Sequence, residues 1–81
     1  MEKEKICALI VEVLKNNFGQ EVSADTELYF LNLDSIAVIE LNLELEKRLG
    51  RVLEIENFYF YNFDQRATIW DLAQKLQIQN S

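Results

Sequence analysis

The residue best placed to take part in chemistry is Ser35, which follows Asp34 at the predicted start of a helix. A hydroxyl at such a position is exposed, and other molecules can reach it. Serine is a poor nucleophile without a neighbouring base, and the chain contains no His to act as one. The same pair is also typical of a plain helix N-cap, because both residue types are favoured there. Taken alone, Ser35 and Asp34 therefore assign no function.

Composition excludes several classes of protein for this chain of 81 residues. With no His and one Cys, it lacks the usual zinc ligands, an internal disulfide and His-dependent catalysis. Its 14 acidic and 8 basic residues give a net charge of −6, which repels nucleic-acid phosphates. No apolar run approaches the roughly 20 residues of a membrane span, and the N-terminus is not typical of a signal peptide. We therefore expect a small cytoplasmic, monomeric protein that others act upon, and not an enzyme.

Three helices are predicted from the spacing of apolar residues. Apolar side chains recur at helical intervals over residues 3–17, and Gly19 can end that helix in a left-handed conformation. The clearest helix is predicted over 35–49. A last helix is expected to begin near Thr68, because Thr68 and Asp71 have the spacing of a capping box. All three helices need partners to cover their apolar faces, which favours a bundle.

The connections between these helices are also distinctive. The loop 18–34 is unusually long for a compact domain, and long loops are often functional. An aromatic-rich stretch follows the second helix, and we predict a short helical turn near 57–63. The aromatic residues are expected to pack in the core, with the alternative that they line a groove for a bulky or aromatic cargo. The fold class is thus all-α, with three main helices, one short helix and a long first loop in one domain, 1–81.

The predicted second helix has two apolar faces instead of one. The first is suited to a bundle core and consists of Val38, Leu41, Leu45 and Leu49. The second lies roughly opposite, is bordered by Glu40 and Glu46, and consists of Ile36, Ile39 and Leu43. With few other elements available to cover it, we expect this second face to be exposed as a docking surface. The alternative is that the aromatic segment covers it.

The long loop and the second helix together resemble the acyl carrier and peptidyl carrier protein family. The first matching motif is Asp25-Thr26-Glu27-Leu28, and the second is Leu31-Asn32-Leu33-Asp34-Ser35-Ile36. Within the helix the matching residues are Glu40, Leu41, Leu45, Glu46, Leu49 and Gly50. Length, acidity and the start of the last helix also agree, so the resemblance covers essentially the whole chain. Asn32 replaces the usual glycine of the motif, and we expect the turn to survive because asparagine tolerates positive φ.

This resemblance implies a specific role for each site residue. Ser35 is the expected attachment point of a 4′-phosphopantetheine arm, whose thiol holds acyl or aminoacyl groups as thioesters. Asp34 is expected to contribute to recognition by the phosphopantetheinyl transferase that installs the arm from coenzyme A. The exposed helix face is expected to bind that transferase, an acyl- or aminoacyl-loading enzyme and a downstream synthase or transferase. The residues assigned to that contact are Ile36, Ile39, Glu40, Leu43 and Glu46.

Several alternatives remain open within and beyond this interpretation. We expect a free-standing carrier, whose cargo could be a fatty acyl, polyketide, amino acid or D-alanyl group. A large buried void would favour a sequestered acyl chain, and a filled core would favour an aminoacyl or short cargo. The rival from another class is an acidic helical interaction module without a prosthetic group, which has no use for Ser35. The single thiol, Cys7, is expected to be buried and structural.

Overall fold

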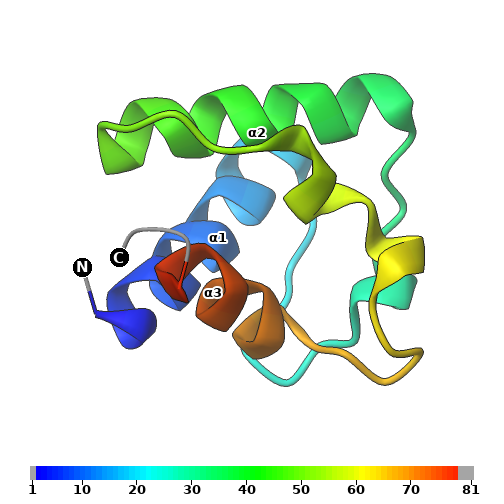
Figure 1. Ribbon diagram of the computed structural model, residues 1–81. Coiled ribbons are helices and arrows are strands. Elements are labelled where there is room, and N and C mark those ends of the chain that lie inside the picture. Colours follow the sequence, from blue (N-terminus) through cyan, green and yellow to red (C-terminus); the bar gives the residue numbers. More distant parts are fainter. Residues whose placement is uncertain (1, 79–81) are drawn as a thin grey trace.

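Three α-helices form the frame of the protein (Figure 1). The structure is a computed structural model, and it describes residues 2–78. The helices are α1 (Lys3–Phe18), α2 (Ser35–Leu49) and α3 (Ile69–Ile78), and the 3-10 turns are η1 (Leu28–Phe30), η2 (Ile55–Phe58) and η3 (Phe60–Asn62). The all-α prediction is confirmed, and α2 has the predicted bounds. The aromatic segment differs, because it forms two short turns instead of one. Tyr59 separates them with a non-helical ψ of 86°.

Local sequence signals set the ends of the helices as predicted. Gly19 and Gly50 adopt left-handed φ values of 66° and 72°, and each closes the helix before it. At the start of α3, the Thr68 N–H donates to Asp71 Oδ2 at 2.8 Å, and the Asp71 N–H donates to Thr68 Oγ1 at 3.4 Å. This reciprocal pair is the predicted capping box. The prediction of a positive-φ turn at Asn32 is wrong, since within the described residues only glycines have positive φ.

The core lies between the inner faces of the three helices. α1 packs chiefly against α3, and α2 lies along one edge of the molecule above both (Figure 1). Fully buried apolar side chains come from every helix: Ile6, Ile10, Val13, Leu14, Leu28, Leu41, Leu45, Phe58, Ile69, Leu72 and Leu76. Each such side chain contributes about 1.5–3 kcal/mol by leaving water. The radius of gyration is 11.2 Å, close to the value expected for a single small domain.

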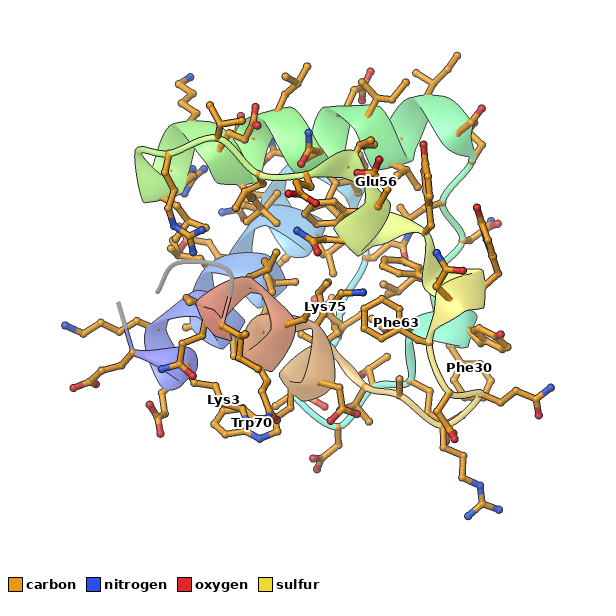
Figure 2. All side chains as sticks on the ribbon, in the orientation of Figure 1. Lys3, Phe30, Glu56, Phe63, Trp70 and Lys75 are labelled. Atoms are coloured by element: carbon orange, nitrogen blue, oxygen red, sulfur yellow. The ribbon has the colours of Figure 1, made fainter. Side chains whose placement is uncertain are left out.

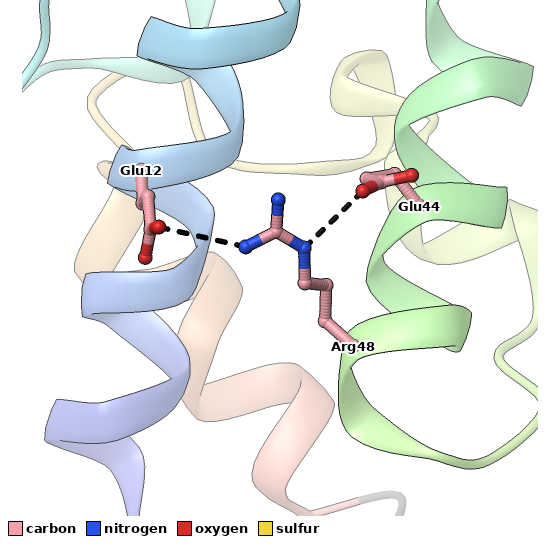
Figure 3. A network of polar contacts seen from close by, with 3 residues as sticks. All are labelled: Glu12, Glu44 and Arg48. Atoms are coloured by element: carbon pink, nitrogen blue, oxygen red, sulfur yellow. Dashed lines mark hydrogen bonds and ion pairs between the residues drawn. The ribbon is translucent and has the colours of Figure 1, made fainter.

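Polar contacts at the surface join the helices outside the core. Arg48 of α2 lies between Glu12 of α1 and Glu44 of its own helix, at 3.5 and 3.2 Å (Figure 3). At the other side of α1, the Lys3 ammonium lies 4.2 Å from the centre of the Trp70 ring (Figure 2). Both contacts link side chains of neighbouring helices at the surface.

Backbone hydrogen bonds fasten the long first loop to the segment before α3. The Leu28 N–H donates to the Ala67 carbonyl at 2.8 Å, and the Ile69 N–H donates to the Thr26 carbonyl at 3.0 Å. A further bond joins the Trp70 N–H to the Ala24 carbonyl at 3.1 Å. These pairs satisfy backbone groups of a loop that has few others available. These bonds hold the middle of the loop, residues 24–28, against the start of α3.

Candidate functional site

Ser35 is the first residue of α2, and its side chain is exposed. The capping role at this helix end belongs to its neighbour. Asp34 is the N-cap residue, and its Oδ1 accepts a hydrogen bond from the Ala37 N–H at 2.8 Å. In residues 2–78 the Ser35 hydroxyl makes no hydrogen bond. The predicted N-cap is therefore confirmed at Asp34 and not at Ser35, whose hydroxyl is left available to another molecule.

The second apolar face of α2 is exposed, as predicted. Ile36, Ile39 and Leu43 are 66%, 51% and 57% exposed. On the opposite face of the same helix, Leu41 and Leu45 are fully buried. The aromatic segment leaves the second face open, so the alternative in which that segment covers it is wrong. Three large apolar side chains in a row on one helix face are typical of a surface that binds other proteins.

The two predicted acidic neighbours of this face have different surroundings. Glu40 is exposed, and it lies between Ile36 and Leu43 along the helix. Glu46 is half-buried, and its Oε2 accepts a hydrogen bond from the Leu53 N–H at 2.7 Å. Glu46 thus holds the chain that follows α2 in place. Ile36, Ile39, Glu40 and Leu43 are named the docking surface after their expected role, and a contact of Glu46 with partners stays a prediction.

A groove lies directly beside Ser35 and has a volume of about 410 Å³. Its lining comes from the start of α2 and from the two aromatic turns: Leu33, Asp34, Ser35, Val38, Ile39, Ile55, Phe58, Tyr59, Phe60 and Tyr61. The run of aromatic residues after α2 suggested such a groove only as an alternative to core packing. Phe58 is 1% exposed and packs in the core while it also lines the groove, and a role of the groove in holding cargo stays a prediction.

The chain matches a known protein family over most of its length. The profile of the family described as "Phosphopantetheine attachment site" matches residues 4–76. The chain belongs to this family. No curated protein and no solved structure gives a significant match. The family assignment therefore rests on a profile that spans nearly all of the helical frame.

As a member of this family the chain is a carrier protein, and the family is non-catalytic. Membership implies a covalently attached 4′-phosphopantetheine, a phosphopantetheinyl transferase and client enzymes. The rival interpretation as an acidic interaction module without a prosthetic group does not account for this match. The profile does not resolve which acyl or aminoacyl group is carried.

The start of α2 fits such a group on physical grounds. An exposed hydroxyl without a hydrogen-bond partner can be modified without the loss of a native contact. The positive end of a helix dipole favours a phosphodiester by roughly 0.3–1 kcal/mol. The Asp34 carboxylate opposes this effect, because it carries a like charge. Its hydrogen bond to the Ala37 N–H stabilises that charge at the helix end.

Other side chains of the described region offer little further chemistry. Over residues 2–78 no group of three or more Cys, Asp or Glu side chains is arranged to hold a metal ion. None of the described helices has the length and apolar character needed to cross a membrane. Cys7 is buried as predicted, and burial raises the pKa of its thiol above the ordinary value. The nearby charge of Lys3 lowers that pKa by a smaller amount.

Proposed function

We propose that Ser35 is the residue to which the 4′-phosphopantetheine arm is attached. The observation that carries this proposal is the exposed Ser35 hydroxyl, without an intramolecular partner, at the start of α2. The only other serine in the described region is Ser23, whose hydroxyl lies 3.5 Å from Thr26 Oγ1 in a turn of the first loop. Ser35 alone combines a free hydroxyl, a helix N-terminus and an adjoining groove.

The attachment needs a second protein, because the Asp34 carboxylate is engaged in capping α2 and no other described residue beside the groove is a base for Ser35. A phosphopantetheinyl transferase removes the Ser35 proton, and the Ser35 oxygen attacks the β-phosphate of coenzyme A. A bond forms between that oxygen and phosphorus, the phosphoanhydride bond breaks, and adenosine 3′,5′-bisphosphate leaves. When bound, the arm supplies a thiol that holds acyl or aminoacyl groups as thioesters. The protein itself contributes a positioned hydroxyl and surfaces for its partners.

The docking surface is proposed to bind the transferase and the client enzymes in turn. Its exposed apolar side chains lie within one helical turn of Ser35 or along the same face, so a bound enzyme is brought to the arm. Glu40 and the net charge of −6 favour partners with a basic patch. A carrier must release each enzyme between steps, so a small interface of less than about 1,200 Å² in total suits the task.

Asp34 is proposed to help the transferase recognise the site, while it also caps α2. The clients are proposed to be an acyl- or aminoacyl-loading enzyme and a downstream synthase or transferase. The loading enzyme attaches the cargo to the thiol of the arm. The described residues act as a single carrier domain in this scheme.

Intact mass spectrometry tests the proposal directly. The protein is incubated with coenzyme A, magnesium and a broad-specificity phosphopantetheinyl transferase, alongside Ser35→Ala and the matched control Ser23→Ala. We expect one phosphopantetheinyl group on the wild type and on Ser23→Ala, and none on Ser35→Ala. Circular dichroism of each variant shows whether it is folded. A gain of the same mass on folded Ser35→Ala, or no gain on folded wild type, would overturn the proposal.

A further inference from the structure

The groove beside Ser35 is apolar over most of its surface. Asp34 is the one charged residue among the described residues that line it, and Asp34 lies at the same edge as Ser35. In Figure 1, η2 and η3 lie beneath the N-terminal half of α2 and form the far wall. Its volume of about 410 Å³ falls within the range of pockets that bind small molecules, about 300–1,000 Å³. A group carried on Ser35 starts at the mouth of this groove.

Aromatic rings form the wall and floor of the groove. Tyr59 and Tyr61 are stacked, with ring centres 5.7 Å apart and planes inclined by 13°. Tyr61 is 74% exposed, so most of its ring has no protein neighbour. Phe58 is almost fully buried and closes the side of the groove toward the core. Phe60 meets the ring of Phe63 edge to face at 6.1 Å, which holds the wall in place from behind.

We propose that the aromatic lining of this groove makes an aromatic acyl group the preferred cargo, with Tyr59 and Tyr61 as the residues that set the preference. The inference rests on the proposed attachment at Ser35. An aromatic ring presents about 150–250 Å² of apolar surface and gains further from offset or edge-to-face contact with other rings. Ordering the flexible arm costs conformational entropy. A two- or three-carbon acyl group buries too little surface to offset that cost, and a ring buries enough.

The shape and polarity of the groove disfavour the other cargo classes. A long alkyl chain needs a channel that continues into the core, and Phe58 closes that direction. The ammonium group of an aminoacyl or D-alanyl cargo loses its water among apolar side chains, which is costly without a partner. Asp34 could pair with it only at the mouth. A flat, uncharged ring suits the apolar, aromatic walls of the groove.

The test compares two ring cargoes of similar size with a small aminoacyl group on the intact protein. A transferase installs three amide-linked coenzyme A analogues, which resist hydrolysis, and these carry phenylacetyl, cyclohexylacetyl or alanyl groups. Amide NMR spectra of each form are compared with that of the protein carrying the unloaded arm. Because the ring current of a phenyl group shifts nearby signals at any affinity, binding is read from nuclear Overhauser contacts between the cargo and Ile55, Tyr59 and Tyr61. We expect strong contacts with phenylacetyl, weak contacts with cyclohexylacetyl and none with alanyl. Equal contacts with phenylacetyl and cyclohexylacetyl would overturn the aromatic preference.

Variants and a second readout link the effect to the wall of the groove. Thioester-linked phenylacetyl should hydrolyse about threefold to tenfold more slowly on the protein than on free pantetheine, the range that one added aromatic contact gives. Tyr59→Leu and Tyr61→Leu should remove most of this protection. Tyr29→Leu is the matched control, since Tyr29 is exposed but does not line the groove. Unchanged protection in Tyr59→Leu and Tyr61→Leu would overturn the inference.

The same samples separate this inference from the proposed function. If intact mass shows no attachment at Ser35, then the proposed function fails and no loaded form exists to examine. If the mass is gained at Ser35 but the groove residues show no contact with any cargo, then only the inference about the groove is wrong.

Discussion

The carboxylate of Glu46 accepts a hydrogen bond from the backbone N–H of Leu53, seven residues further along the chain, at 2.7 Å. Leu53 is buried, so its N–H has little access to water as an alternative partner. Just before it, the Arg51 guanidinium donates to the Leu76 carbonyl in α3 at 3.0 Å. Charged side chains thus fasten the segment after α2 to two helices. This segment leads into η2 and sets the position of the groove wall.

The first prediction concerns Glu46. Replacing it by Ala leaves the Leu53 N–H without its acceptor, and we expect a loss of about 1–3 kcal/mol in the free energy of unfolding. Glu46→Gln keeps an acceptor oxygen and should recover much of that loss. Urea unfolding followed by circular dichroism measures both.

Glu40→Ala is the matched control for Glu46. Its carboxylate is exposed on the docking surface, so the substitution should change the free energy of unfolding by less than about 0.5 kcal/mol. Equal stability of Glu46→Ala and Glu40→Ala would show that the bond to Leu53 contributes nothing.

The second prediction concerns the contact of Arg48 with Glu12 and Glu44. These side chains are partly exposed, so we expect Arg48→Met to lower the free energy of unfolding by only about 0.2–1 kcal/mol. High salt should reduce the difference, because salt screens exposed charges. Lys47→Met serves as the control, since Lys47 is exposed on the same turn of α2. A difference that persists unchanged in concentrated salt would contradict this view.

The third prediction concerns the capping box of α3. Thr68→Ala and Asp71→Ala should each cost about 1 kcal/mol, since each removes an acceptor from the first turn. The two residues act as a unit, so the double variant should cost less than the sum of the single variants. Thermal unfolding of the four proteins gives the coupling. Strict additivity would mean that the two residues do not depend on each other.

Local signals made much of this fold predictable from the sequence. The bounds of α2 follow from Asp34 before it and Gly50 after it, since an N-cap carboxylate and a left-handed glycine act within one turn. The capping box of α3 is local in the same way. The exposure of Ile36, Ile39 and Leu43 was predictable because a helix with two apolar faces can bury only one of them in so small a bundle.

Contacts between distant segments were not predictable. Nothing in the sequence shows that the Leu28 N–H meets the Ala67 carbonyl, since the pairing depends on how α1 and α3 meet. Glu46 was assigned to the docking surface from its angle on the helix. Its bond to Leu53 depends on the path of the chain after Gly50, which the spacing of residues along the helix does not indicate. The groove was not predictable for the same reason, because its wall and Ser35 come from separate segments of the chain.

The fourth prediction concerns Cys7 and pH. Burial raises the pKa of its thiol, so the folded protein holds that proton more tightly than the unfolded chain does. The stability from this difference is complete below the pKa of the unfolded chain and is lost as pH rises through the pKa of the folded state. Unfolding measured across alkaline pH should therefore show a decline that Cys7→Ala lacks. An identical decline in Cys7→Ala would assign it to other groups.

The same burial gives a practical means to separate two thiols. At neutral pH iodoacetamide should alkylate Cys7 of the folded protein far more slowly than in concentrated urea, because the thiol is buried and little of it is ionised. The thiol of an unloaded arm on Ser35 has no such protection, so the protein that carries the unloaded arm should gain one rapid alkylation. Rapid labelling of Cys7 before the arm is attached would contradict its structural role.

The last prediction concerns the docking surface. Ile39→Ser and Leu43→Ser replace exposed apolar side chains and should leave the free energy of unfolding nearly unchanged. Each should lower kcat/KM of the transferase about tenfold, which corresponds to about 1.4 kcal/mol of lost interface contact. Glu40→Gln should slow association and weaken its dependence on salt, because a lost charge reduces electrostatic steering.

The control for this surface is Val52→Ser. Val52 is the most exposed of the large apolar side chains, at 88%, and lies beyond the end of α2. If general stickiness of exposed apolar groups drives binding, then Val52→Ser should lower kcat/KM as much as Ile39→Ser does. If the face of α2 is the contact, then Val52→Ser should behave as the wild type. Only the second result agrees with a surface that leads partners along α2 to Ser35.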